Sequence, residues 1–454
     1  MPTILIASCP PIGHIGPLLN VARGLVLRGD RVTVLTSARH ADAIRAIGAE
    51  PLPLPTGADF DDSALDADLP GRAETSGIER VNFDIKHVFV RPLPYQAAAL
   101  ADALAANTFD AVLTDAFFLG VLPMLLGGRR DRPPVLTYST TPLLLSSRDT
   151  APSGMGLLPG SGLSGRARNR LLNLLAQRVL LRPAHRSLTA MLDVLGLPES
   201  PAFVLDSGVL ADRLIVPTVP EFEYPRSDLP GNVRFVGAVT PTPATAFRPP
   251  VWWDRLGRDR PVVHVTQGTV DNADLSRLIE PAVTALADAD VTVVVSTGGR
   301  PVEQIGITLP ANTVVTEYIP HDVLLPEVDA MVTNGGYGAV QRALGAGVPL
   351  VVAGNTEDKP EVAARVEWAG AGINLRTGTP SAAAVGAAVR EILGDDRYRR
   401  RARELEAAFA QRDGVAEIAA LLDEVIAEHR SPGRGHGCVP VRNTAMSAES
   451  RRAG

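Results

Sequence analysis

Short apolar runs alternate with helical patterns along most of this chain, and no other feature of the sequence restricts its fold so strongly. Each run is long enough for one buried strand, and each helical stretch can cross from one strand to the next. Repeated strand–helix–strand units build a doubly wound parallel sheet with helices on both faces. The sequence therefore predicts an α/β protein with two Rossmann-like domains. The predicted strands are 3–8, 31–36, 50–54, 110–115 and 134–139 in the first half, and 262–266, 291–296, 313–317, 330–333 and 350–352 in the second.

A proline-rich stretch with little periodicity, residues 217–250, separates the two halves. The length of 454 residues also agrees with two or three domains of ordinary size. After the second half come a charged amphipathic stretch and a polar end rich in glycine and proline, a composition typical of disorder. The predicted division is a first domain at 1–222, a linker at 223–250, a second domain at 251–395, a helical segment at 396–429 that packs back toward the first domain, and a disordered tail at 430–454.

Charge and cysteine content exclude several classes of partner. The chain has 44 lysines and arginines against 50 aspartates and glutamates, and this net charge of −6 gives no global field for nucleic acid or an anionic membrane. Cys9 and Cys438 are too few and too far apart for a disulfide scaffold. No basic region precedes the first apolar stretch, and the most apolar segment, 116–128, is too short to cross a bilayer. We expect a cytoplasmic monomer or homodimer that acts on small molecules, with no nucleic acid and no membrane span.

His14 lies just after the first predicted strand, on a turn rich in proline and glycine that precedes a helix with Pro17 in its first turn. Ligands of open α/β sheets bind beyond the carboxyl ends of the strands. A histidine there can act as a general base near neutral pH, or it can cap the turn. Asp115 ends another strand of the same sheet, where it can orient the imidazole or cap the next helix. The turn lacks the spacing of a dinucleotide-binding fingerprint.

Four loops of the second half also follow predicted strands. The richest holds three glycines in residues 335–338, at the start of a helix. Glycines let a backbone approach a ligand, and the N–H groups of a helix N-terminus favour a diphosphate, although a tight turn also requires glycine. Residues 266–269 can add hydroxyl and N–H donors to the same phosphate, or they form a simple turn.

The other two loops carry an aromatic ring and a group of charges. Tyr318 can stack on a nucleobase or lie at the edge of the core. The carboxylates of Glu357 and Asp358 can hold two sugar hydroxyls, and Lys359 can meet a phosphate or a carboxylate. Capping of the next helix explains most of the same loop. Lys359 is one of only two lysines in the chain, the other being Lys86, so its position is informative.

The sequence gives no sign of a metal site. The pairs Asp66/Asp68 and Asp288/Asp290 match the acid-x-acid pattern of some metal-dependent enzymes that use nucleotide sugars, but such pairs carry little weight in so acidic a chain. No histidines, cysteines and carboxylates have metal-ligand spacing. We therefore expect no metal and no cofactor.

Taken in order, these motifs resemble those of GT-B glycosyltransferases of the family that includes plant UDP-glycosyltransferases and bacterial macrolide and antibiotic glycosyltransferases. The resemblance covers most of residues 1–428 and implies two Rossmann-like domains that face a cleft. It implies that the first domain binds the acceptor and that the second binds a nucleotide-diphosphate sugar, which is a co-substrate. Its marks are residues 13–17, 115, 266–269, 318–321, 334–338, 347–349 and 358–359.

The resemblance also implies roles for single residues. His14 matches the general base and Asp115 its partner, while Asp358 matches the acid that holds sugar hydroxyls. Tyr318 stands where the family usually has a base-stacking tryptophan. The implied donor-binding residues are Gly268, Thr269, Tyr318, Ile319, His321, Asn334, Gly335, Gly336, Tyr337, Gly338, Asp358 and Lys359. The candidate acceptor-binding residues, Ile12, Phe117 and Phe118, include two from an apolar stretch that equally fits a core.

Two departures from the family leave the donor open. Asn334 replaces the usual histidine that contacts the diphosphate, and asparagine can donate a hydrogen bond but carries no charge. Lys359 stands where glutamine is usual. The favoured hypothesis is an inverting, metal-independent transfer from a UDP- or dTDP-sugar to a hydroxyl or amine of a small natural product. A catalytically inactive or auxiliary sugar-nucleotide-binding protein on the same fold, or a GT-B-like sugar-nucleotide epimerase, is the alternative.

Overall fold

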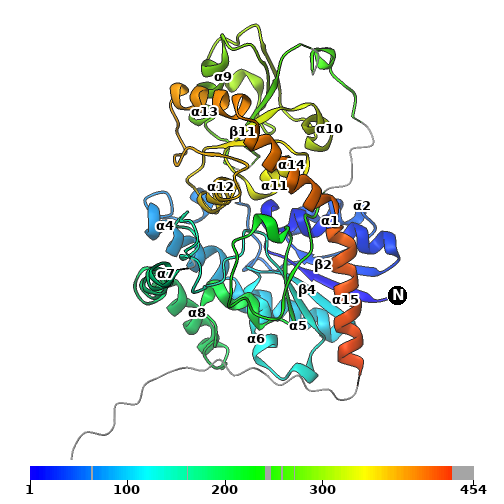
Figure 1. Cartoon of the computed structure of the whole chain (residues 1–454). Coiled ribbons are helices and arrows are strands. Elements are labelled where there is room, and N and C mark those ends of the chain that lie inside the picture. The colour runs from blue at the N-terminus through cyan, green and yellow to red at the C-terminus, as the bar shows by residue number, and fades with distance from the viewer. Residues whose placement is uncertain (63–64, 161, 241–246, 257–258, 270, 432–454) are drawn as a thin grey trace, which may run out of the picture.

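The computed structural model describes residues 1–62, 65–160, 162–240, 247–256, 259–269 and 271–431. These residues form two α/β domains, one above the other in Figure 1. The first domain contains a seven-stranded sheet in the order β3-β2-β1-β4-β5-β6-β7, and the second a six-stranded sheet in the order β10-β9-β8-β11-β12-β13. All neighbouring strands are parallel. The prediction of two doubly wound parallel sheets is confirmed.

The strands are short, and most of their residues are buried. In the first sheet they are β1 (Thr3–Ala7), β2 (Arg31–Thr36), β3 (Glu50–Pro53), β4 (Ala111–Asp115), β5 (Val135–Tyr138), β6 (Arg213–Val216) and β7 (Val233–Phe235). In the second sheet they are β8 (Val262–Thr266), β9 (Thr292–Ser296), β10 (Thr313–Thr316), β11 (Ala330–Thr333), β12 (Leu350–Val352) and β13 (Gly372–Asn374).

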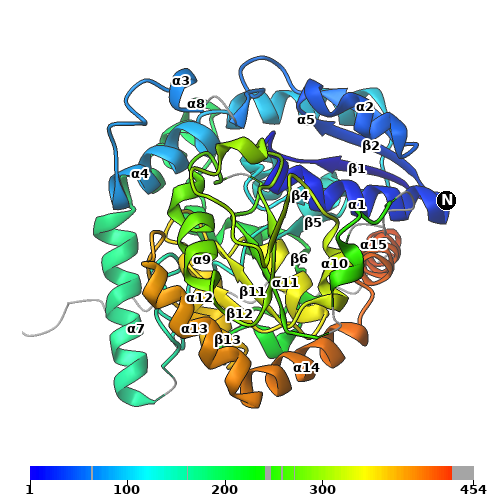
Figure 2. The ribbon, with the colours of Figure 1, turned by 90° about the horizontal axis from the view of Figure 1, so that it is seen from above.

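Helices cover both faces of each sheet (Figure 2). In the first domain they are α1 (Ile12–Arg28), α2 (Ala41–Ala46), α3 (Leu65–Asp68), α4 (Gly77–Asp84), η3 (Ile85–Val90), α5 (Leu93–Ala106), α6 (Leu122–Leu126), α7 (Leu163–Leu175), η6 (Ala176–Leu180) and α8 (Arg182–Val194). The later helices are α9 (Ile279–Leu286), α10 (His321–Leu324), α11 (Tyr337–Gly345), α12 (Lys359–Trp368), α13 (Ala382–Gly394), α14 (Asp396–Ala410) and α15 (Gly414–Arg430). None of the helices described combines the length and the apolar character needed to cross a bilayer.

Strands buried on both faces explain the continuous apolar runs in the sequence. Successive residues of β1 point to opposite sides of the sheet. Ile4 and Ile6 pack in the cluster that contains residues of α1 and α15, whereas Leu5 packs on the other face with Leu100 of α5. A central strand of this kind has no polar face, so its sequence is a continuous apolar run and not an alternation of apolar and polar residues.

The expected linker at 223–250 begins inside the first domain, so this part of the predicted division is wrong. Strand β7 lies in that range and pairs with β6, from Leu214 opposite Val233 to Val216 opposite Phe235. Both strands are short and contain arginine, so their sequences do not differ clearly from those of the neighbouring loops. Strand β13 was missed for a similar reason, because it has three residues and starts with glycine. The predicted tail beyond residue 431 lies outside the described residues.

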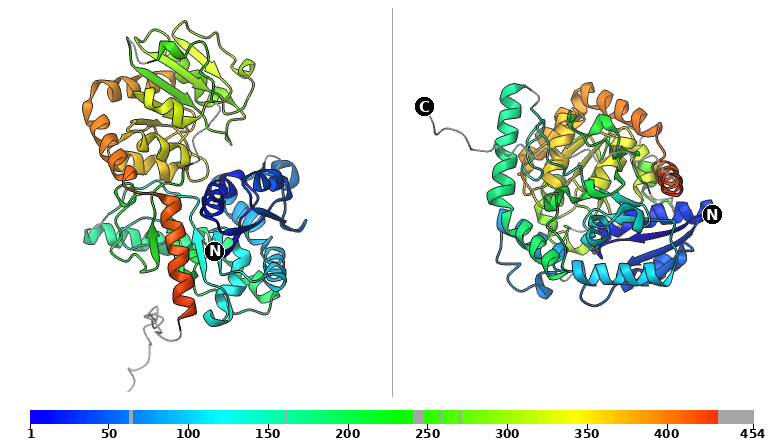
Figure 3. Two further views of the ribbon diagram at one scale, coloured as in Figure 1. Left: turned by 90° about the vertical axis from the view of Figure 1, so that its right-hand side faces the viewer. Right: turned by 90° about the horizontal axis from the view of Figure 1, so that it is seen from below.

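The helical segment predicted at 396–429 consists of two helices. α14 ends at Ala410 and α15 starts at Gly414, where the Asp413 carboxylate accepts a hydrogen bond from the Ala416 N–H at 3.0 Å. α15 runs along the first domain (Figures 1 and 3). Its apolar residues Ile418, Leu422, Val425 and Ile426 belong to the same core cluster as α1. The end of the described chain therefore completes the first domain.

Candidate active site

His14 lies in the first turn of α1, directly after β1. The Pro11 carbonyl accepts hydrogen bonds from the N–H groups of His14 at 2.9 Å and Ile15 at 3.1 Å, which starts the helix at Ile12. The predictions that His14 precedes the helix and that Pro17 stands in its first turn are wrong, because the helix begins five residues before this proline. The helical turn fixes the backbone that carries the imidazole.

Asp115, at the end of β4, holds the imidazole of His14. Its Oδ2 atom lies 2.9 Å from His14 Nδ1 and 3.3 Å from the Cys9 nitrogen, and Oδ1 accepts from the Phe117 N–H at 3.0 Å. The hydroxyl of Thr140 lies 3.4 Å from the same Nδ1. A carboxylate on Nδ1 favours the tautomer that carries its proton there and leaves Nε2 unprotonated. Nε2 is thus the nitrogen that remains for a substrate proton.

Charges from both domains set the pKa of His14. Burial alone would lower this pKa, but the Asp115 carboxylate raises it, and the carboxylates of Asp358 and Glu357 add to the rise. Burial would raise the pKa of Asp115, yet the charge and hydrogen bond of His14 lower it. Asp358 and Glu357 belong to the second domain, so the two domains bring opposite sides of one site together. A histidine with a raised pKa is a stronger base.

Two phenylalanine rings lie beside His14. The ring centroids of Phe89 and Phe117 are 5.5 Å and 5.3 Å from that of the imidazole, and 4.6 Å from each other. Phe117 is thus beside the base, as an acceptor contact requires. Phe118 is completely buried in the core, so its assignment to the acceptor site is wrong. Ile12 is 46% exposed at the start of α1, where it is free to contact a ligand.

Three loops of the second domain meet beyond the carboxyl ends of β8, β11 and β12. The side-chain amide of Asn334 donates a hydrogen bond to the Gln267 carbonyl. A Cβ on Gly268 would lie 3.3 Å from Asn334 Oδ1, and one on Gly354 would lie 2.0 Å from the Asn334 carbonyl oxygen. Thr269 is exposed beside this contact. Asn334 therefore joins the loops, which is a structural role that the sequence did not suggest.

The glycines before α11 open its N-terminus. Gly335 has φ +88°, and a Cβ there would lie 2.7 Å from the side chain of Val352, so this turn requires glycine. Gly336 and Gly338 add no side chain that would cover the first N–H groups of the helix. The side chain of Tyr337 is buried in the core, so this residue can offer a ligand only its N–H group.

Lys359 is held by carboxylates of its own domain. Its Nζ lies 2.5 Å from Glu357 Oε2 and 3.8 Å from Asp271 Oδ2, and Asp271 also accepts from the Thr356 hydroxyl at 2.7 Å. The Lys359 side chain is only 5% exposed. Burial raises the pKa of Asp358 to about 6, with Lys359 opposing the rise and Glu357 adding to it. The ammonium group is thus already balanced by two carboxylates before any donor binds.

The loop after β10 offers one free ring and two packed side chains. Tyr318 is 64% exposed, whereas Ile319 is 3% exposed and belongs to the core. The ring of His321 packs against the buried His264 at 5.4 Å between centroids. Burial, together with His264 and Arg342, lowers the pKa of His321 to about 3. Tyr318 is therefore the side chain available for stacking, and Ile319 can contribute only its backbone.

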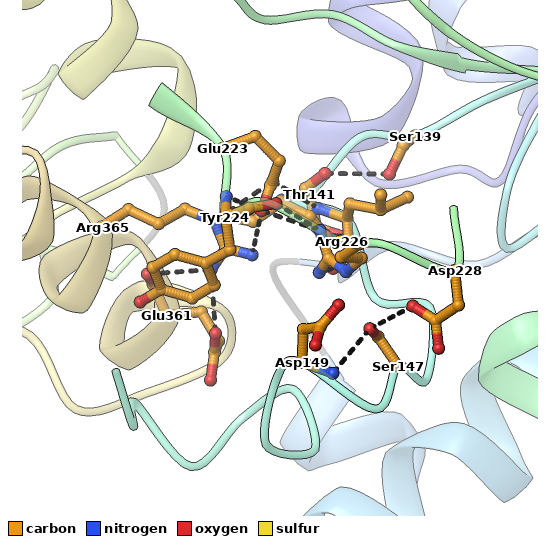
Figure 4. Close-up of polar contacts among 12 residues, drawn as sticks. Ser139, Thr141, Ser147, Asp149, Glu223, Tyr224, Arg226, Asp228, Glu361 and Arg365 are labelled. Atoms are coloured by element: carbon orange, nitrogen blue, oxygen red, sulfur yellow. Dashed lines mark hydrogen bonds and ion pairs between the residues drawn. The ribbon is translucent and has the colours of Figure 1, made fainter. Parts of the chain in front are cut away.

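A buried network of ion pairs links the two sides of the site (Figure 4). Arg365 of α12 donates to Glu223 from Nη2 at 2.8 Å and from Nε at 3.1 Å, and to Glu361 Oε2 from Nη1 at 2.8 Å. Glu361 Oε1 accepts from the N–H groups of Gly154 and Gly156 at 2.9 Å and 2.8 Å. These glycines belong to the first domain. The helix that starts at Lys359 is therefore bonded directly to a loop of the first domain.

Sequence reasoning missed several residues of this region: Phe89, Thr140, Asp271, Glu223 and Arg365. One signal was available, because Glu361 and Arg365 are four residues apart and form a helical pair. Phe89 has no such signal, since it lies in a π-helical stretch with no motif. Among the described residues, no group of three or more histidines, cysteines, aspartates or glutamates is arranged to hold a metal ion.

Comparisons with known proteins agree with this architecture. Residues 280–425 match the family described as Erythromycin biosynthesis protein CIII-like, C-terminal domain. The chain is 41% identical over 425 residues to 4'-demethylrebeccamycin synthase of Lentzea aerocolonigenes, covering 93% of this chain and 99% of that protein. It is 36% identical to UDP-glycosyltransferase 2 of Phaeomoniella chlamydospora, covering 94% and 96%. The crystal structure of the glycosyltransferase of kitacinnamycin superposes with a TM-score of 0.70 at 25% identity, covering 94% and 99%.

Proposed function

The chain belongs to the glycosyltransferase family of these relatives, and on that premise we propose that it is an inverting, metal-independent enzyme that transfers a sugar from a UDP- or dTDP-sugar to a hydroxyl or amine of a small natural product. The observation that carries this proposal is the distance of 2.9 Å between His14 Nδ1 and Asp115 Oδ2. It pairs a base with an orienting carboxylate at the edge of the sheet that faces the second domain.

His14 is the general base of the proposed reaction. Its Nε2 takes the proton from the acceptor as the acceptor oxygen or nitrogen attacks the anomeric carbon, and Asp115 stabilises the imidazolium that forms. The bond between the anomeric carbon and the diphosphate oxygen breaks on the opposite face, so the configuration inverts. Phe89 and Phe117 support an apolar or aromatic acceptor, because their rings lie beside the base.

The second domain holds the donor in this proposal. The N–H groups of residues 335–338 at the start of α11 stabilise the departing diphosphate. Because these donors stabilise its negative charge, the reaction needs no metal ion. Thr269 is exposed next to Gly268 in the chain and adds a hydroxyl donor. Asp358 accepts hydrogen bonds from sugar hydroxyls, and Tyr318 stacks on the nucleobase. Water is excluded as the domains close on both substrates.

Lys359 and its two carboxylates bear on the choice of sugar. The group formed by Asp271, Glu357, Asp358, Lys359 and Arg277, which pairs with Asp271 at 2.8 Å, has three acidic and two basic side chains. We expect this group to disfavour a sugar that carries a carboxylate, because the negative charge of the sugar would find no unpaired cation there. We expect it to accept neutral or amino sugars.

The His14→Ala variant tests the proposal, with His429→Ala on the exposed end of α15 as the control. One general base contributes about 10²–10⁴ in rate, so His14→Ala should lose nearly all transfer while still binding UDP or dTDP. Near wild-type turnover with intact folding would refute the assignment of the base. Transfer that disappears in EDTA and returns with Mg²⁺ would refute metal independence. A product with the anomeric configuration of the donor would refute inversion.

A further inference from the structure

α7 and η6 have their polar side turned toward the protein. Asn169, Asn173 and Gln177 follow one another at four-residue spacing on the inner side. Asn169 Nδ2 donates to two carbonyl oxygens of the loop 146–160 at 3.2 Å each, Asn173 Nδ2 donates to two others at 3.1 Å, and Gln177 Nε2 donates to a serine hydroxyl at 2.8 Å. Asn169 is completely buried. The surface helix of a globular protein normally buries its apolar side, so this arrangement is inverted.

The outer side of the same segment is apolar. Leu163, Leu171, Leu174, Leu175 and Val179 are 90%, 66%, 52%, 41% and 59% exposed. They gather within 17 consecutive residues, whereas isolated exposed side chains are the ordinary case for a protein surface. Figure 2 shows α7 along the edge of the molecule that lies opposite α15, and the right-hand view of Figure 3 agrees.

Arginines border these leucines, and no acid lies near them in the sequence. Residues 150–192 contain six arginines and no aspartate or glutamate, in a chain whose net charge is −6. Arg170, Arg178, Arg182 and Arg186 are exposed and form no ion pair with any residue in the described ranges. The net charge of the whole chain, which suggested no attraction to an anionic membrane, therefore conceals an arginine-rich stretch without acidic residues on α7, η6 and the first turns of α8.

We propose that the outward side of α7 and η6 docks on an anionic lipid surface, with its leucines among the acyl chains and its arginines at the headgroup phosphates. A helix with leucines beside arginines is suited to lie in the plane of a membrane interface. This inference does not depend on the proposed function. The same segment follows the loop of Gly154 and Gly156, which is bonded to Glu361 of the second domain.

Two features favour lipid over a protein partner. Contact with a second copy through a two-fold axis would place the arginines of one face against those of the other. Protein interfaces are enriched in aromatic residues, whereas leucine and valine are under-represented among their energetic hot spots. The exposed large apolar residues on α7 and η6 are leucine and valine.

Co-sedimentation of the full-length protein with vesicles tests the proposal. The protein should bind vesicles of phosphatidylcholine and phosphatidylglycerol mixed two to one, and should bind vesicles of phosphatidylcholine alone far less. Replacing Arg170 or Arg178 with glutamine should lower the partition coefficient about fivefold each, because one arginine near an anionic surface contributes about 1 kcal/mol. High salt should release the protein.

The triple variant Leu171→Gln, Leu174→Gln, Leu175→Gln should abolish binding, and Leu27→Gln, at an exposed leucine of α1 on another face, is the matched control. Circular dichroism of each variant shows that folding is intact. The absence of sedimentation with anionic vesicles would overturn the proposal, as would binding that the triple variant retains. A dimer that the triple variant dissociates would assign this surface to a second copy and would also overturn it.

Discussion

Replacing Arg365 with methionine should destabilise the protein by about 3 kcal/mol, the lower end of the range for a broken buried ion pair. Arg365 and Glu223 are 1% and 2% exposed, so the remaining carboxylate could not recover its hydration. The loss stays near the lower end because Glu223 keeps other partners. Arg226 Nη1 lies 3.1 Å from its Oε1, and the N–H groups of Tyr224 and Leu143 donate to it at 2.8 Å and 3.2 Å.

Urea unfolding and thermal melting measure this effect. In a domain of 150–250 residues, about 3 kcal/mol corresponds to a fall in Tm of roughly 6–12 °C. The double variant Glu223→Gln, Arg365→Met removes both charges, so its loss should be smaller than the sum of the two single losses by about 0.5–3 kcal/mol. Arg45→Met is the control, because its pair with Asp42 is exposed and should contribute nothing measurable.

Two results would refute this reasoning. A loss below about 1 kcal/mol in Arg365→Met would mean that the buried pair behaves like a surface pair. Strict additivity in the double variant would mean that Arg365 and Glu223 do not act on each other. Because the network also holds Gly154 and Gly156 through Glu361, the single variant should also raise donor hydrolysis relative to transfer, which is measured as UDP release with and without acceptor.

Further predictions concern pH and the donor turn. Burial lowers the pKa values of His264 and His321 to about 4 and about 3, so the unfolded chain binds protons that the folded chain does not, and the free energy of unfolding should fall as pH drops from about 6.5 to about 4. His321→Gln should flatten that slope in melting curves, and an unchanged slope would contradict the assignment. The His14 pKa is raised, chiefly by Asp115 against the effect of burial. We therefore expect kcat/KM to fall as the pH drops below this pKa, which lies above the ordinary value for histidine. Asp115→Asn should move that acidic limb to lower pH and reduce the maximum, and an unmoved limb in the pH–rate profile would count against the pair. Gly335→Ala should cost about 1–3 kcal/mol, because it forces a side chain to φ +88° and 2.7 Å from a valine, and it should weaken UDP binding in a thermal-shift assay; wild-type values in both assays would show that the turn adapts.

The sequence predicted those parts of the fold that depend on continuous apolar burial. Strands such as β1 and β8 are buried on both faces, so their residue types alone reveal them. Strands β6, β7 and β13 have only three or four residues, and each contains arginine, glycine or asparagine, so none gives a continuous apolar run. Local patterns do not separate such short segments from loops, which is why the predicted linker included part of the first sheet.

The candidate site shows the same limit. His14 and Asp115 were found because each follows a strand, and parallel strands end at one edge of a sheet. Arg365 and Glu223 are 142 residues apart in sequence, and each alone looks like an ordinary surface charge. Phe118 was misplaced because two adjacent phenylalanines point to different sides, and only the packed structure shows that Phe117 meets the imidazole while its neighbour enters the core.

The return of α15 to the first domain has a consequence for synthesis on the ribosome. Ile418, Leu422 and Val425 fill the layer over α1, yet they are translated after the whole second domain. The nascent first domain therefore carries an uncovered apolar face while more than 170 further residues, 236–413, are made. A growing chain of this kind is a natural client for chaperones that shield apolar surface. A circular permutant with α15 placed ahead of β1 would let the first domain close before the second is translated, and should depend less on such help.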